Sequence, residues 1–210
     1  MVNIAVFASG SGTNFETILQ HIEDGSLPVQ CQCLIVDKEQ AYARTRAQQH
    51  QIEDYYFNPK SYPNKEAYEK DILKVLKDKN VDLIVLSGYM RFIGKVLLEA
   101  IRKQSSICIR PIYQNFQGLI SIQDAFEAGV SQTGVTVHYV DEGVDTGPII
   151  RQERVPIDPN WNLETLEEHV HAMEYAMHCG CRILATVHGR IHGGTEAKAT
   201  AAAAGPKGQL

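Results

Sequence analysis

The sequence predicts an α/β fold, in which a mostly parallel, twisted, Rossmann-like sheet is flanked by helices. Short apolar runs alternate with amphipathic segments, which is typical of parallel strands joined by right-handed crossovers. The first apolar run, residues 3–8, ends in a glycine-rich turn that leads directly into a helical pattern. The 210 residues are 44% hydrophobic and 21% charged, which is enough apolar material for one soluble globular domain.

In the first half of the chain, predicted strands alternate with predicted helices. Four apolar runs are predicted strands, at 3–8, 31–36, 55–57 and 81–86. Helical patterns separate them, at 15–22, 40–50 and 64–76. In the third of these helices the spacing places four side chains on the inward face, Tyr68, Ile72, Val75 and Leu76.

The second half is predicted to add three strands and three helices. The predicted helices are 96–101, 123–129 (with Gly129 as a C-cap) and 163–187. The first strand, 106–110, is predicted to stop at Pro111, before irregular chain over 112–118. The other two strands are 134–140 and 149–157, and we expect 149–157 to pair with its neighbour. Residues 1–190 are predicted to form one domain, followed by a low-complexity tail at 191–210.

Composition argues against several functional classes. The net charge of −5 disfavours non-specific binding to nucleic acid or to an anionic membrane. No apolar run has the length of a membrane span, and the first residues enter a strand rather than a signal peptide. The odd count of five cysteines, including two distant C-x-C pairs, indicates reduced thiols in the cytoplasm rather than disulfides or a metal site.

The glycine turn at 10–14 is a candidate anion site. Glycines allow a close approach of the backbone to a ligand, and the free amides of a helix N-terminus attract phosphate. Thr13 and Asn14 add side-chain donors. The segment 88–93 also follows a strand, so both segments are predicted to face one crevice. One alternative is a tight turn that serves packing only. Another is the dinucleotide-binding turn of a nicotinamide oxidoreductase, because Asp37 stands where a ribose-binding acid would lie. Phe15, however, replaces the third glycine of the dinucleotide-binding fingerprint.

An acidic loop follows the strand that begins at Gly134. Val135, Val137 and Tyr139 lie on one face of that strand, and Thr136, His138 and Val140 on the other. The loop then brings together three carboxylates, Asp141, Glu142 and Asp145. Neighbouring carboxylates repel one another, which is a route to a shifted pKa and to acid–base chemistry. A solvated acidic turn is the alternative interpretation.

Four segments together resemble the phosphoribosylglycinamide formyltransferase family, the folate-dependent formyl-transfer enzymes of purine synthesis. They are 5–15, 87–91, 124–129 and 133–150, in the family's order and spacing. The last reads Thr-Gly-Val-Thr-Val-His-Tyr-Val-Asp-Glu-Gly-Val-Asp-Thr-Gly-Pro-Ile-Ile and is the most specific. The resemblance extends to about residue 190 and is looser for the related hydrolases and methionyl-transfer-RNA formyltransferases.

The resemblance implies two ligand sites with a cleft between them. Gly12, Thr13 and Asn14 would hold the phosphate of glycinamide ribonucleotide, in a half spanning about 1–100, and Glu174 would contact the same substrate. Asp145 would be the catalytic carboxylate, in a folate and catalytic half spanning about 101–190. The donor 10-formyltetrahydrofolate would meet eight residues: Lys65, Met90, Arg91, Phe92, Ile93, Asp141, Glu142 and Val144. A monomer or a homodimer, without metal, is expected.

The sequence departs from the family pattern around the predicted catalytic centre. Before Pro111 the family places an Asn and a His around one apolar residue; here those positions hold Cys108 and Arg110, and the segment is one residue short. Ile120 replaces a further family His, and His-Cys-Gly at 178–180 replaces Tyr-Pro. Arginine can stabilise an oxyanion but stays protonated, so it cannot shuttle a proton.

Two substitutes for the missing groups are conceivable. His138 could act as the base, against the alternative of a structural strand histidine. Cys108 could accept the formyl group transiently beside Arg110, against the alternative of a small buried cysteine. The sequence therefore predicts a formyltransferase with altered catalysis, or else a homologue that binds the ligands without turnover.

Overall fold

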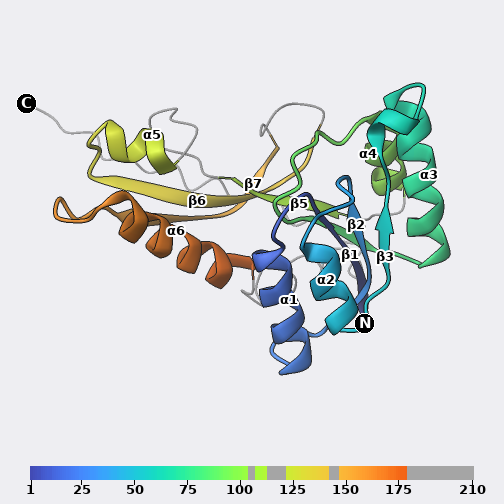
Figure 1. Cartoon of the computed structure of the whole chain (residues 1–210), viewed down its shortest axis with the longest axis horizontal. Helices are drawn as coiled ribbons and strands as arrows, with labels where there is room; N and C mark the ends of the chain where they lie inside the picture. The colour runs from blue at the N-terminus through green and yellow to red at the C-terminus, as the bar shows by residue number, and fades with distance from the viewer. Residues whose placement is uncertain (104–106, 113–121, 142–146, 179–210) are drawn as a thin grey trace, which may run out of the picture.

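The computed structural model describes residues 1–103, 107–112, 122–141 and 147–178. Within them, seven strands form one sheet in the order β3-β2-β1-β4-β5-β6-β7 (Figure 1). The strands are β1 Val2–Ala8, β2 Val29–Val36, β3 Asp54–Tyr56, β4 Leu83–Leu86, β5 Ile107–Ile112, β6 Gln132–Tyr139 and β7 Ile149–Pro156. The helices are α1 Thr13–Glu23, α2 Ala43–Gln49, α3 Lys65–Asp78, α4 Lys95–Lys103, α5 Ile122–Glu127 and α6 Leu163–His178, with a 3₁₀ turn at Pro59–Ser61.

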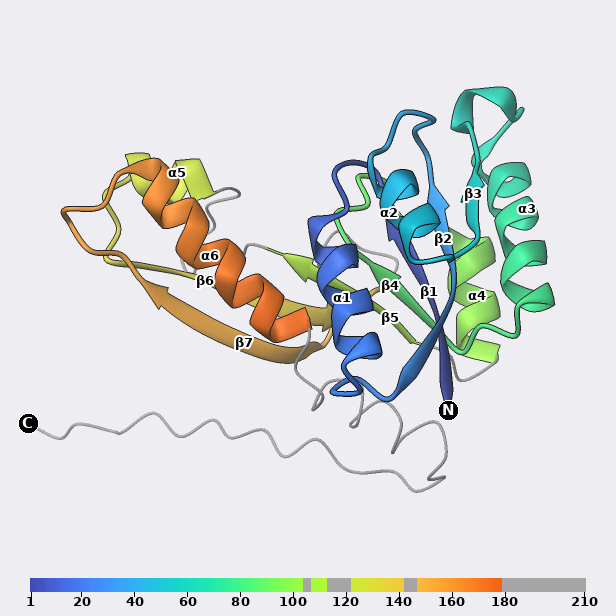
Figure 2. The ribbon, with the colours of Figure 1, turned by 60° about the horizontal axis from the view of Figure 1, so that its bottom comes forward.

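The first five strands are parallel, as the sequence predicts, and the structure shows that they are doubly wound. Strand β1 pairs with both β2 and β4, so the chain reverses its direction of travel across the sheet between β1 and β4. Helices α1 and α2 lie on one face with α6, whereas α3 and α4 cover the other (Figures 1 and 2). In such sheets a ligand crevice forms beyond the carboxyl ends of the strands where the winding reverses.

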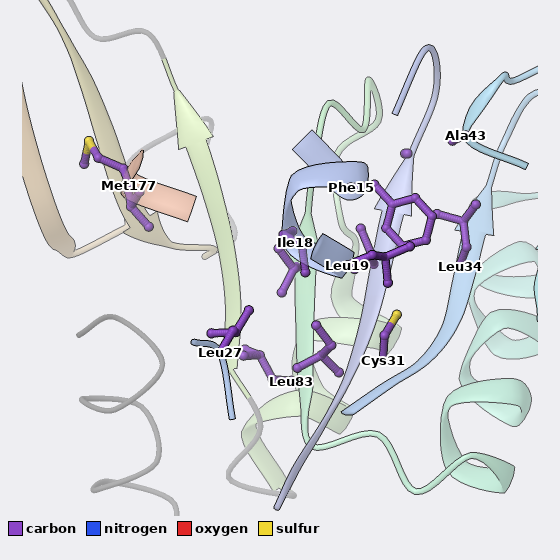
Figure 3. Packing of buried hydrophobic residues seen from close by; sticks show 14 of the residues in the cluster. Phe15, Ile18, Leu19, Leu27, Cys31, Leu34, Ala43, Leu83 and Met177 are labelled. Carbon is purple, nitrogen blue, oxygen red and sulfur yellow. The ribbon is translucent and has the colours of Figure 1, made fainter. Parts of the chain in front are cut away.

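Side-chain alternation along β1 supplies both halves of the core. Val2, Ile4, Val6 and Ala8 pack on the α1 side, whereas Ala5 and Phe7 pack on the α3 side. Figure 3 shows the first side, where Phe15, Ile18 and Leu19 of α1 meet Leu34 of β2 and Leu83 of β4. Phe15 is fully buried, which stabilises the fold by about 1.5–3 kcal/mol. The residue in place of the third fingerprint glycine is therefore a core anchor of α1.

The sheet continues beyond β5 as an antiparallel extension. Strand β5 pairs antiparallel with β6, and β6 with β7, which confirms the expected pairing of 149–157 with its neighbour. The prediction that Pro111 ends the strand was wrong: β5 runs to Ile112, and Pro111 lies opposite Val137. Proline lacks the amide donor, but on this side of the strand the ladder requires a donor only at alternate residues.

Most predicted helices are confirmed with shifted ends. Helix α2 begins at Ala43 rather than at residue 40, and α6 is described to His178, so the predicted continuation to 187 lies outside the described residues. In α3 the buried residues are Tyr68, Glu69, Ile72 and Leu76, with Val75 only partly buried. Asn64 caps α3 by accepting the Ala67 N–H at 2.9 Å. The predicted tail at 191–210 also lies outside the described residues, and none of the described helices is long and apolar enough to cross a membrane.

A histidine joins α1 to α2. His50, which follows α2, contacts Glu23 through Nδ1 at 2.6 Å and Glu16 through Nε2 at 2.9 Å. The hydrogen bond to Glu23 and the one to Glu16 raise the pKa of His50 above its ordinary value of 6.5, against the opposing effect of burial. Burial alone would raise the pKa of Glu16, but hydrogen bonds from His50 and Arg46 lower it overall. The imidazole of His50 therefore joins the two helices, and the two carboxylates that it contacts favour its charged form.

We expect the His50→Gln substitution to make the protein less stable at mildly acidic than at alkaline pH, relative to wild type. Because the folded-state pKa of His50 is raised, its contribution is fully present below the unfolded pKa and is lost as the pH rises through the folded pKa. Urea unfolding of both proteins at about pH 6 and about pH 9 measures the difference. As a control, Glu23→Gln should lower the His50 pKa in an NMR titration. If His50→Gln loses the same free energy of unfolding at both pH values, the link between the His50 pKa and stability is contradicted.

Candidate functional site

A pocket of about 220 Å³ lies where the winding of the sheet reverses. Segment 9–14 after β1 and the segment after β4 form its two sides, so the two glycine-containing turns share one crevice, as predicted. Lys38, which follows β2, adds a cation. The lining residues are Ser9, Gly10, Ser11, Gly12, Thr13, Asn14, Lys38, Ser87, Gly88 and Met90.

Hydrogen bonds fix the two sides of the pocket relative to each other. The Ser9 N–H donates to the Gly88 carbonyl at 3.2 Å, and the Ser9 hydroxyl accepts the Met90 N–H at 2.9 Å. Helix α1 starts at Thr13, directly behind the pocket wall, so its first amides have no partner within the helix. The N-terminal end of the helix dipole favours an anion there.

Gly12 is the residue that lets the loop enter α1. Its φ of 70° lies in the left-handed region that favours glycine. A Cβ at this position would lie 2.7 Å from the Cβ of Ala43 and 2.8 Å from its Cα. The turn therefore packs directly on the start of α2, and glycine is required both for the backbone angle and for the space.

Two polar atoms near the pocket have no hydrogen-bond partner among the described residues. They are the hydroxyl of Ser87, in a residue only 3% exposed, and the side-chain oxygen of Asn14. An unpaired buried polar atom costs about 1–3 kcal/mol, so a polar ligand or water here would recover that free energy. Ser87 and Lys38 were missed by the sequence interpretation; the available signal was their position one residue after the end of β4 and two residues after the end of β2.

The predicted folate residues after β4 form an exposed apolar surface beside a cation. Met90 is 73% exposed and Phe92 57%, whereas Ile93 is buried. The Arg91 guanidinium lies 3.8 Å from Asp37 and 5.9 Å from the centroid of the Tyr68 ring. Asp37 is thus a buried neighbour of Arg91.

Lys65 lies beside the same segment. It is the first residue of α3, and its Cε would be 2.9 Å from a Cβ built on Gly94, so Lys65 and the end of the 90–93 segment are brought together. Between them, buried Glu69 accepts the Gly94 N–H at 2.5 Å. Desolvation raises the pKa of Glu69, and the hydrogen bond from Gly94 only partly offsets it. Glu69 therefore satisfies the amides at the start of α4.

The strand register places position 110, one of the two positions in β5 that depart from the family pattern, next to His138. Position 108 pairs with Ile84 of β4, and position 110 lies directly opposite position 138 of β6. His138 is buried, and its Nδ1 lies 2.7 Å from the Tyr139 carbonyl, which accepts a hydrogen bond from that nitrogen. Positions 110 and 138 are thus neighbours across the ladder.

The acidic loop is described only at its ends. Asp141 follows β6 and is half-buried, whereas Glu142, Val144 and Asp145 lie outside the described residues. Gly147 returns so close to the strand that a Cβ there would collide with the Tyr139 carbonyl. The Tyr139 N–H donates to the Pro148 carbonyl at 3.0 Å, so the loop closes back on the end of β6.

Glu174 is buried on α6 and does not line the pocket described above. It is 5% exposed, and its Oε2 lies 3.1 Å from Nδ1 of His171. The hydrogen bond to Glu174 raises the pKa of His171, opposed by burial. The structure also contains, among the described residues, no group of three or more His, Cys, Asp or Glu that could hold a metal ion.

Comparison with known proteins agrees with this arrangement. A family model described as formyl transferase matches residues 2–179. The phosphoribosylglycinamide formyltransferase of Bacillus subtilis is 44% identical over 176 residues, covering 83% of this chain and 90% of the relative. The enzyme of that name from Haemophilus influenzae is 37% identical, with 85% and 84% covered.

A solved structure is similar as well. The crystal structure of glycinamide ribonucleotide transformylase 1 from Geobacillus kaustophilus superposes with a TM-score of 0.79 at 42% identity, covering 88% of this chain and 98% of that one. Identity at this level over nearly the whole relative excludes the nicotinamide oxidoreductase suggested by Asp37. The chain belongs to the formyl transferase family and, within it, to the phosphoribosylglycinamide formyltransferases.

Proposed function

We propose that this protein transfers a formyl group from 10-formyltetrahydrofolate to the amine of glycinamide ribonucleotide in purine biosynthesis. The observation that carries the proposal is the pocket between the loop after β1 and the segment after β4. It joins an anion site at a helix N-terminus to an exposed apolar surface within a single crevice, in a chain of this family.

The ribonucleotide is bound through its phosphate. Gly12 and Thr13 offer backbone amides at the start of α1, and the side-chain NH2 group of Asn14 adds a further donor. Lys38 adds a positive charge to the lining. Glu174 contacts the same substrate through its carboxylate, which is an acceptor for hydroxyl groups.

The folate is held on the other side of the crevice. Exposed Met90 and Phe92 offer apolar and aromatic area for a planar ring, and Ile93 supports them from the core. Arg91 and Lys65 provide cations for an anionic tail. The loop residues Asp141, Glu142 and Val144 complete the pteridine pocket in this proposal.

The reaction is a direct acyl transfer. The substrate amine attacks the formyl carbon, a tetrahedral intermediate forms, and the carbon–nitrogen bond to the folate breaks as that nitrogen takes a proton. Asp145 sets the protonation of the groups around the formyl carbon, and Arg110 stabilises the oxyanion. The proton lost by the amine must reach the leaving nitrogen, and Arg110 cannot carry it because it stays protonated.

A non-catalytic ligand-binding protein is the second candidate. It is favoured by Cys108 and Arg110, which stand at the family's Asn and His positions. Calorimetry with glycinamide ribonucleotide and with a folate analogue, followed by a turnover assay on the same sample, separates the two. Binding of both ligands with turnover supports the enzyme, binding without turnover selects the second candidate, and absence of binding contradicts both.

A further inference from the structure

Helix α2 holds two consecutive carbonyl groups of the loop that lines the pocket. The Ala43 N–H donates to the Gly10 carbonyl at 3.1 Å, and the Arg46 Nε–H donates to the Ser11 carbonyl at 2.9 Å. These contacts join segments that are more than thirty residues apart in the sequence. They are also the contacts that define which way the two peptide groups face.

The orientation of a carbonyl determines the orientation of the next amide. In a planar trans peptide the C=O bond and the following N–H bond point in opposite directions, and there are no cis peptide bonds among the described residues. Because the carbonyls of Gly10 and Ser11 are turned toward α2, the amides of Ser11 and Gly12 are turned away from it. Ser11 and Gly12 both line the pocket.

The Arg46 side chain is itself held in place. Its Nη1 donates to Glu16 Oε2 at 3.1 Å, and its guanidinium lies 5.1 Å from the centroid of the Tyr42 ring. Arg46 is 22% exposed and Glu16 21%. Glu16 lies in the first turn of α1 and also contacts His50. Arg46 is therefore attached both to the loop and to the helix whose N-terminus faces the pocket.

We propose that Arg46 is a positioning residue for phosphate: it fixes the Ser11 carbonyl so that the Gly12 amide faces the anion. This inference rests on the proposed function of the pocket. Orientation outweighs charge in the effect of Arg46, because Glu16 neutralises the guanidinium at 3.1 Å. The mechanism is preorganisation, in which the amide is aimed before the ligand arrives and the loop need not be ordered on binding.

Arg44 provides a matched control on the same helix. Its Nε donates to Asp54 Oδ2 at 2.5 Å, its Nη1 donates to the Glu39 carbonyl at 3.0 Å, and its guanidinium lies 5.8 Å from the Tyr56 ring. Arg44 thus makes one contact of each kind made by Arg46: a carboxylate, a backbone carbonyl and an aromatic ring. None of these partners lines the pocket.

The test compares Arg46→Met, Arg46→Lys and Arg44→Met with wild type. The probes are inorganic phosphate, followed by amide shifts of ¹⁵N-labelled protein, and then glycinamide ribonucleotide and a folate analogue by calorimetry. We expect Arg46→Met to weaken phosphate and ribonucleotide binding about tenfold, the effect of one charge-assisted hydrogen bond, and to leave the folate analogue unchanged. Arg46→Lys should also bind phosphate and the ribonucleotide more weakly than wild type, because an ammonium group lacks the forked guanidinium that reaches both Ser11 and Glu16.

Arg44→Met should bind all three probes as wild type does, with a similar loss of melting temperature. Equal phosphate affinities of Arg46→Met and Arg44→Met would overturn the proposal, as would full retention of affinity in Arg46→Lys. So would an absence of phosphate binding by wild type. If phosphate binding depends on Arg46 but the wild-type protein transfers no formyl group, the positioning role stands and only the proposed reaction falls.

Discussion

Replacing Cys108 with asparagine and Arg110 with histidine should raise the turnover number by about 10²- to 10⁴-fold, the usual contribution of a positioned acid–base group. A histidine at 110 can take the proton from the attacking amine and return it to the leaving nitrogen, which arginine cannot do. An asparagine at 108 restores an amide N–H donor for the developing oxyanion, in place of the weak donor of a thiol.

The strand register supports this choice of positions. Residues 108 and 110 are two apart in β5, and position 110 lies directly opposite His138 in the ladder. The β5–β6 pairing also runs through Ile109 and Pro111, so the substitutions fall within an established ladder. Neither substitution changes a glycine or a proline, and we expect the ladder to tolerate both.

A second double variant isolates proton transfer from size and polarity. Cys108→Asn combined with Arg110→Gln gives polar side chains at both positions but no titratable group at 110, so it should recover far less activity. In the Asn/His background, Asp145→Asn should remove most of the gain if the carboxylate sets protonation at the same centre. The measurements are turnover number and its pH profile; Asn/His and Asn/Gln variants of equal activity would contradict the proton-transfer argument.

The parallel half of the fold was predictable because its signals are local. The run 3–8, the glycines after it and the helical spacing of Phe15, Ile18 and Leu19 each specify one element, and the crossover rule then orders them. Pro111 was misjudged for the opposite reason. A proline ends a strand only where the neighbouring strand needs an amide donor from the proline position. For Pro111 the neighbouring residue is Val137, which lies in a strand more than twenty residues away in the sequence.

The candidate site was predictable to a similar extent. Segments 10–14 and 88–93 were expected to meet, and part of each lines the same pocket. Arg46 was not foreseen, because its role depends on a hydrogen bond to Ser11 across 35 positions of sequence. Within its own helix it is one of two arginines in an Ala-, Arg- and Gln-rich segment, and nothing local distinguishes it from Arg44. Long-range contacts between a side chain and a backbone carbonyl leave no periodic signal.

Substituting Gly12 with alanine should lower both stability and phosphate affinity. A φ of 70° costs a non-glycine residue about 1–2 kcal/mol, and forcing a methyl group against the Cβ and Cα of Ala43 costs about 1–3 kcal/mol more. The melting temperature should therefore fall by roughly 5–15 °C. Moving Ala43 away also weakens its hydrogen bond to Gly10, so phosphate binding should weaken by about tenfold or more.

Gly25→Ala separates the two causes of this loss. Gly25 has a similar φ of 77°, but nothing lies within 4 Å of a Cβ built on it. Gly25→Ala should lower the free energy of unfolding only by the cost of the left-handed backbone angle, about 1–2 kcal/mol, and should leave phosphate affinity unchanged. Thermal melts and phosphate titrations of both variants give the comparison. If Gly12→Ala and Gly25→Ala lose the same stability, the contact with Ala43 contributes nothing and the turn is limited by its backbone angle alone.

Combining Gly12→Ala with Ala43→Gly then tests whether the loop and α2 act as one unit. Removing the Ala43 methyl relieves the 2.7 Å contact but not the 2.8 Å contact with its Cα, so part of the lost stability should return. Affinity for phosphate should recover in the same proportion, since both depend on how closely α2 approaches the Gly10 and Ser11 carbonyls. Recovery of stability without recovery of affinity would mean that the anion site does not depend on its attachment to α2.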